Sequence, residues 1–144
     1  MPQISRSALV PFSAAQMYQL VNDIHSYPKF LPGCASSRVI NVSKNEMTAA
    51  VEIARAGINK SFTTRNILIN NQSIKIQLVD GPFRRLLGAW SFTPLSPQAC
   101  KVELHLDFEF THRLSELTFG RVFKELAGSM LQAFTQRAQE IYRV

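Results

Sequence analysis

The side chains best suited to acid–base or metal chemistry lie close together late in the chain. His105, Asp107 and Glu109 recur at every second position, and on a β-strand this spacing places all three on one face. A histidine beside two carboxylates could bind a metal ion or exchange protons with a substrate. The intervening positions are apolar, so this polar face is expected to point to solvent, and the pattern predicts an ordinary half-buried strand.

The other reactive side chains are isolated. His25 and His112 fall in predicted loops without a recognisable partner. Two cysteines, Cys34 and Cys100, are too few for a disulfide framework or a structural zinc site. Cys34 is interpreted as a small buried residue rather than a nucleophile. Phosphate-loop, dinucleotide-binding, nucleophile-elbow and zinc-protease motifs are missing. We therefore predict no catalytic residue, no metal ligand and no required cofactor.

Length and composition indicate one folded domain over residues 1–144. The chain has 144 residues, of which 46% are hydrophobic and 18% charged, a balance that argues against disorder. It contains no run of about 20 apolar residues that would span a membrane. The first six residues lack the apolar region of a secretory signal. These features predict a soluble, cytoplasmic protein.

The chain is basic, with 16 Lys and Arg against 10 Asp and Glu and a net charge of +6. Such a charge attracts polyanions, including nucleic acid, the ribosome and anionic membranes. The basic residues are scattered, so an ordinary solvated surface explains them equally well. The candidate polyanion contacts are Lys60, Arg65, Arg84, Arg85, Lys101 and Lys124.

The apolar pattern changes period along the chain. Alternation over Ile4–Val10 predicts a first strand, and Ser13 is a favourable N-cap for a short helix. A second helical turn or loop is expected over 23–32. A period of two then extends to about residue 110 and predicts six strands joined as hairpins, one of them turning at 56–59. Apolar residues next recur every three or four positions, which predicts a single amphipathic helix over Leu114–Tyr142.

These elements predict an α+β fold in which a curved antiparallel sheet surrounds the long C-terminal helix. Each apolar face needs the other, and a sheet curved around a helix is expected to leave a hydrophobic cavity. Ten phenylalanines and one tryptophan exceed what a small core requires. Thr64 and Asn66 would orient the head group of an apolar ligand. The predicted cavity residues are Phe62, Thr64, Asn66, Leu78, Leu86, Trp90, Phe92, Leu104, Leu106, Phe108, Phe123, Met130 and Phe134.

Several blocks spread over the whole chain resemble a known family. The blocks are Val10–Ser13, Met17–Ile24, Tyr27–Cys34, Phe62–Asn66, Asp80–Phe83, Trp90–Leu95 and Val102–Phe110. They are similar to the coenzyme-Q-binding branch of the START-like proteins, which are related to polyketide cyclases and dehydrases within the SRPBCC superfamily. The Tyr-Pro-x-Phe-Leu-Pro-x-Cys block is the most specific. The resemblance implies the helix-grip (START/Bet v 1-like) fold.

The resemblance implies two functions, neither of them enzymatic. The first is binding of ubiquinone or a similar isoprenoid lipid in support of respiration. Gly81–Gly88 would then serve as a lid or membrane portal, because apolar residues flank its two arginines. The alternative is a bacterial ribosome association toxin that binds the large subunit and its rRNA, and so blocks subunit joining and translation initiation. An antitoxin and the surface of the inner membrane are further candidate partners, and the oligomeric state stays open.

Overall fold

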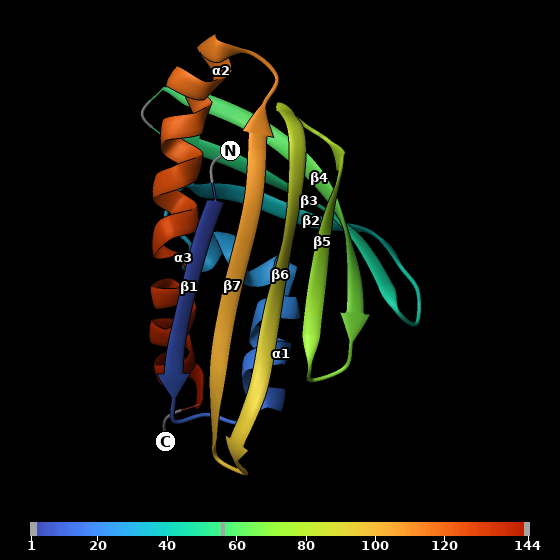
Figure 1. The fold of residues 1–144 in the computed structure, drawn as a ribbon, viewed down its shortest axis with the longest axis vertical. Coiled ribbons are helices and arrows are strands. Elements are labelled where there is room, and N and C mark those ends of the chain that lie inside the picture. Colours follow the sequence, from blue (N-terminus) through green and yellow to red (C-terminus); the bar gives the residue numbers. More distant parts are fainter. Residues whose placement is uncertain (1–2, 56, 143–144) are drawn as a thin grey trace.

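An antiparallel sheet of seven strands wraps around a long helix in the computed structural model, which describes residues 3–55 and 57–142 (Figure 1). Residue 56, in the turn predicted at 56–59, and both ends of the predicted domain lie outside the described residues. The elements in chain order are β1 (Gln3–Val10), α1 (Ala14–Asn22), the 3-10 helix η1 (Ile24–Lys29), β2 (Cys34–Val42), β3 (Glu46–Arg55), β4 (Ile58–Ile69), β5 (Ser73–Asp80), β6 (Phe83–Ser96), β7 (Ala99–Phe110), α2 (Arg113–Leu117) and α3 (Phe119–Tyr142).

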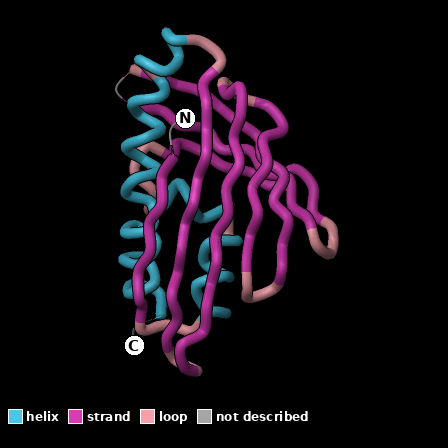
Figure 2. The backbone as a smooth tube through the Cα atoms, in the orientation of Figure 1, coloured by secondary structure: helices cyan, strands magenta, loops and turns pink. Residues whose placement is uncertain are grey.

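The strand order is β1-β7-β6-β5-β4-β3-β2, and all neighbours pair antiparallel. Strands β2 to β7 follow one another as hairpins, while β1 from the start of the chain pairs with β7. The sheet curves strongly from β7 to β2, and all the helices lie on its concave side or at its end (Figure 2). The predicted α+β helix-grip fold is therefore confirmed. The bounds of β2 could not be predicted from hydrophobic alternation, because most residues of that strand are exposed or half-buried on both faces.

Helix α1 begins where the sequence predicts. The Ser13 hydroxyl accepts a hydrogen bond from the Gln16 backbone amide at 3.1 Å, and the Gln16 side chain accepts one from the Ser13 amide at 2.9 Å. This capping box satisfies two backbone donors that the helix itself leaves free. Met17, Leu20 and Val21 are buried, so the predicted apolar face packs into the core.

The single C-terminal helix predicted over 114–142 is wrong at its start. A short helix, α2, ends at Leu117, and α3 begins at Phe119 after a break at Thr118, where ψ is −84°. Both the amide and the hydroxyl of Thr118 donate to the Leu114 carbonyl, at 3.1 and 2.8 Å, and such local bonds compete with continuation of a helix. The break lets Phe119 turn fully into the core while Leu114 and Leu117 stay exposed.

The start of α3 is anchored in a cluster of aromatic rings, here called the aromatic plug. Its rings meet mostly edge to face, with centroids 4.9 to 6.2 Å apart, a geometry that favours aromatic pairs. Gly120 lets the helix approach this closely, because a Cβ there would lie 2.9 Å from the Phe110 ring. The plug consists of Phe62, Phe83, Phe108, Phe110, Phe119 and Phe123.

Candidate binding cavity

An apolar cavity of about 90 Å³ lies between the concave face of the sheet, helix α3 and the η1 segment. One end of it is closed by the aromatic plug, through Phe62 and Phe123. The lining residues are Ile24, Tyr27, Leu31, Cys34, Ala49, Val51, Phe62, Thr64, Asn66, Ile76, Leu86, Trp90, Leu104, Leu106, Phe123, Leu126 and Met130. An apolar cavity of about 150 Å³ holds one benzene ring, so this smaller space takes a ring only if its wall yields, and it is far too small for a polyisoprenoid tail.

Two side chains give this apolar wall a polar spot. Alternate positions on β4 turn Thr64 and Asn66 inward, where they are 9% and 5% exposed. The Thr64 hydroxyl donates to the Asn66 side-chain oxygen at 3.0 Å. Among the described residues the Asn66 amide nitrogen has no hydrogen-bond acceptor. The Asn66 NH₂ group is therefore free to donate to an acceptor in the cavity, which a ketone or ether oxygen would provide.

Tyr27 and Cys34 complete the wall from the η1 side, and neither is reactive there. The Tyr27 hydroxyl donates to the Val21 carbonyl, and burial raises the pKa of Tyr27. Burial and, secondly, the nearby charge of Glu52 raise the pKa of the Cys34 thiol to about 11. At neutral pH the thiol is protonated, and a protonated thiol is a poor nucleophile. Cys34 is a wall residue, as the small buried residue predicted from the sequence would be.

Two phenylalanines predicted to line the cavity are instead core residues. Phe108 is fully buried inside the aromatic plug, with Phe123 between it and the cavity at a centroid distance of 5.0 Å. Phe134 is fully buried one helical turn beyond Met130, against Tyr27 and Trp90 at 5.3 Å each. Both rings face inward as predicted, but other aromatic rings occupy the space that a ligand would need.

Phe92 and Leu78 were also expected in the wall and are not there. Phe92 lies beyond Trp90 along β6, where it packs edge-on against Tyr18 of α1 at 5.8 Å. Leu78 sits near the end of β5 and is only half-buried, beside the register shift between Thr63 and Thr64. The alternation identified the correct face of each strand, but it could not show where along the strand the cavity ends.

Several wall residues escaped the sequence analysis. Ile24, Tyr27 and Leu31 come from η1 and the segment after it, where no period signals a buried face. Four further wall residues lie on the inward-facing positions of predicted strands or on the apolar face of the predicted C-terminal helix. The hydrophobic periodicity that identified their neighbours could therefore have identified them too. These are Ala49, Val51, Ile76 and Leu126.

The lid predicted over Gly81–Gly88 is wrong. Most of this segment belongs to β6, which pairs with β7 from Phe83 onward and with β5 from Leu87 onward. Phe83 and Leu86 are buried, and a register shift at the start of the strand leaves both Arg84 and Arg85 on the surface. The segment is held by the sheet, and only Leu87 offers an exposed apolar side chain.

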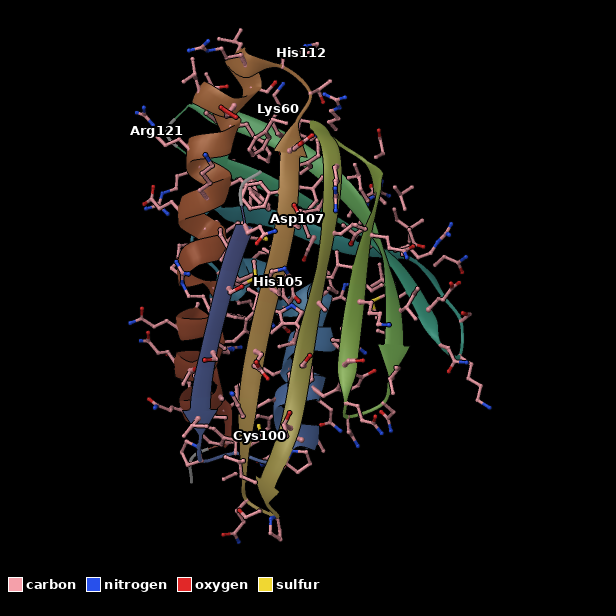
Figure 3. All side chains as sticks on the ribbon, viewed as in Figure 1. Lys60, Cys100, His105, Asp107, His112 and Arg121 are labelled. Carbon is pink, nitrogen blue, oxygen red and sulfur yellow. The ribbon has the colours of Figure 1, made fainter. Side chains whose placement is uncertain are left out.

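The polar face of β7 points outward, as predicted (Figure 3). Its His105 ring nitrogen Nδ1 lies 2.7 Å from the Ser5 hydroxyl, and Asp107 pairs with Arg85 at 3.0 Å. No group of three or more metal-ligating side chains occurs within residues 3–55 and 57–142. His25 and His112 are both exposed.

The six basic residues proposed as polyanion contacts do not form one patch. Arg84 and Arg85 lie near Glu109 and Asp107, at 3.9 and 3.0 Å. Arg65 lies on the convex face of β4, and Lys101 lies at the far end of β7.

Lys60 and Lys124 form the most coherent basic group. Both lie near the ion pair that Arg55 of β3 forms with Glu125 of α3 at 3.3 Å. Lys124 directly precedes Glu125, and Lys60 follows by two residues Ile58, which is opposite Arg55 in the sheet. Among the described residues neither lysine has an ion-pair partner. Together with Arg55 and Glu125 the two lysines give a net charge of +2. Lys60 lies at the end of the molecule where α3 begins (Figure 3).

None of the described helices is both long and apolar enough to cross a membrane.

The sequence matches a family described as polyketide cyclase / dehydrase and lipid transport over residues 10–135. It is 66% identical over 142 residues to the ribosome association toxin RatA of Escherichia coli (strain K12), covering 99% of this chain and 90% of that protein. A more distant relative is the mitochondrial coenzyme Q-binding protein COQ10 homolog B of Xenopus laevis, 29% identical over 97% of this chain and 59% of that protein.

The fold is also similar to that of the Zhui aromatase/cyclase from Streptomyces sp. R1128. The two superimpose with a TM-score of 0.87 over 99% of this chain and 96% of the other, at 14% sequence identity. At that identity the similarity concerns the fold and carries no information about activity.

Proposed function

This chain belongs to the polyketide cyclase / dehydrase and lipid transport family, as its sequence motifs predicted, and from that premise we propose that it acts at the ribosome. It would bind the large subunit, hinder joining of the small subunit and so reduce translation initiation. The observation that carries the proposal is the end-to-end similarity to proteins named ribosome association toxin RatA. This function was the alternative in the sequence analysis, and it now takes precedence over lipid carriage.

Two physical features favour ribosome binding over lipid carriage. The cavity of about 90 Å³ is too small for the tail of a long-chain isoprenoid, so carriage would require the wall to move. The net charge of +6 suits an rRNA surface, where phosphate contacts supply much of the affinity, and so do Lys60 and Lys124, which have no ion-pair partner within residues 3–55 and 57–142. We further propose that the protein is cytoplasmic and acts by occupying a surface rather than by catalysis. An antitoxin would then be a partner that competes for that surface.

Subunit joining tests this proposal directly. Purified large and small ribosomal subunits are mixed under joining conditions with and without the protein and separated on sucrose gradients. We expect the protein to sediment with the large subunit and the peak of joined ribosomes to fall. If joining is unchanged and the protein stays at the top of the gradient at low salt, the proposal is wrong.

A second candidate function is binding of a small quinone-like head group in the cavity. The free Asn66 amide in an otherwise apolar wall favours it, as does the relative named for coenzyme Q binding. A carbonyl oxygen would accept from Asn66 while the ring packs against Trp90. A tail would extend past Met130, whose flexible side chain is half-buried at the wall.

Trp90 reports on this binding, because it is the single tryptophan and lines the cavity. A short-chain ubiquinone should quench its fluorescence in the folded protein. Asn66→Leu keeps the volume and removes the donor, and we expect it to weaken binding roughly tenfold, the value of one or two net hydrogen bonds. Thr93→Val on the exposed part of β6 serves as the control. Equal quenching in Asn66→Leu and in wild type would place the quinone elsewhere.

A further inference from the structure

Helix α2 presents an apolar face that nothing in the described chain covers. None of its five residues is buried, and Leu114 and Leu117 are 72% and 56% exposed. Residues three apart on a helix share a face, so the two leucines form one apolar spot. Helix α2 lies at the end of the molecule, beyond the tip of β7 (Figure 1).

Several cationic side chains lie at the same end of the molecule as this spot. Arg113 precedes Leu114 directly, and Arg121 lies on the first turns of α3. Neither arginine has an ion-pair partner among the described residues. Lys60 and Arg121 lie at this same end of the molecule (Figure 3). Glu116 is the only carboxylate on α2, so the surroundings of the leucines are positively charged.

Exposed leucines near cations are complementary to an anionic bilayer surface. The leucines can enter the boundary between head groups and acyl chains, while the arginines stay among the phosphates. RNA would engage the arginines alone, because an exposed leucine offers a base neither a stacking plane nor a hydrogen bond, and the apolar spot would stay uncovered. A specific protein partner needs about 800 Å² per side, much more than two leucines supply. We propose that α2 docks this protein reversibly on anionic membranes.

The break at Thr118 suits α2 to this role. Helix α3 begins at Phe119, which is anchored in the aromatic plug, and α2 contributes no buried residue to the core. Helix α2 can therefore project from the fold. Substitutions on α2 should therefore leave the fold intact. The proposal is independent of ribosome binding, since the leucines can be removed without changing the charge of the protein.

Co-sedimentation with lipid vesicles tests the proposal. The probes are vesicles of phosphatidylcholine alone and vesicles containing 30% phosphatidylglycerol. We expect wild type to bind only the anionic vesicles, and Leu114→Ser/Leu117→Ser to bind them at least tenfold more weakly. Arg113→Gln/Arg121→Gln should weaken binding several-fold. The matched control, Leu9→Ser/Leu95→Ser, removes two leucines that are 71% and 56% exposed at the opposite end, and should bind like wild type.

Three results of the vesicle experiment would by themselves overturn the proposal. They are no binding of wild type to anionic vesicles, equal losses in the α2 variant and the control, and binding that does not depend on phosphatidylglycerol. Ribosome sedimentation of the same variants separates this inference from the proposed function. If Leu114→Ser/Leu117→Ser abolishes association with the large subunit and leaves vesicle binding unchanged, α2 is a ribosome contact and the membrane proposal is wrong.

Discussion

Replacing Phe134 by alanine should lower the free energy of unfolding by about 3–5 kcal/mol, the range for deleting a fully buried aromatic ring. Phe134 is completely buried and meets Tyr27, Phe30 and Trp90 edge to face at 5.1 to 5.3 Å. It therefore joins α3 to η1 and to the centre of the sheet. Its removal would leave a void between α3, η1 and the sheet, and none of these elements can move to fill the void without losing its other contacts.

Met130 provides the matched comparison, one helical turn earlier on the same face of α3. It is half-buried and already borders the cavity, so Met130→Ala should cost only about 1 kcal/mol. Denaturant unfolding followed by the fluorescence of Trp90 measures both variants. Equal losses for the two would mean that Phe134 lines a cavity rather than forming core, and the assignment of the wall would have to change.

The largest functional effect is expected at the basic group where α3 begins. Lys60→Glu/Lys124→Glu should weaken association with the large ribosomal subunit by roughly 100-fold near 0.1 M salt, since two attractive phosphate contacts become repulsive. The neutral pair Lys60→Gln/Lys124→Gln should reduce the slope of log K against log salt by about 1.5 to 2. Both lysines are exposed and lack ion-pair partners among the described residues, so neither pair of substitutions should destabilise the fold.

Lys44→Gln/Lys75→Gln is the control for net charge. These lysines are also exposed, but they lie on the β2–β3 turn and on β5, away from the start of α3. We expect this pair to change affinity by less than about threefold, through the general field of the protein alone. If both pairs weaken binding equally, the ribosome recognises net charge rather than this group, and the assignment of Lys60 and Lys124 fails.

The fold could be predicted from the sequence because its two periods are clear. The alternation that ends at Phe110 corresponds to β7, and the helical stripe corresponds to the buried face of α3. Ser13 is the N-cap of α1, as predicted from its residue type. The break at Thr118 was missed, since a single threonine lowers helix propensity only slightly and does not by itself end a helix. Only the packing of Phe119 against the aromatic plug makes a new start of the helix favourable there.

The candidate cavity was predicted less completely. Alternation tells which side chains face inward, and on that basis Asn66 and Trp90 were correctly placed at the wall. It does not tell which inward positions another element fills. Phe108 and Phe134 are displaced from the wall by other aromatic rings, and the irregular η1 segment supplies residues such as Tyr27 in their place. Those arrangements depend on contacts between distant parts of the chain.

Equilibrium binding of the wild-type protein to purified ribosomal subunits is the decisive measurement for action at the ribosome. The protein is titrated with large and with small subunits separately, over a salt series from 50 to 200 mM. We expect a clear preference for the large subunit and an affinity that falls steeply as salt rises. Equal binding to both subunits, or no binding to the large subunit at 50 mM salt, would contradict it.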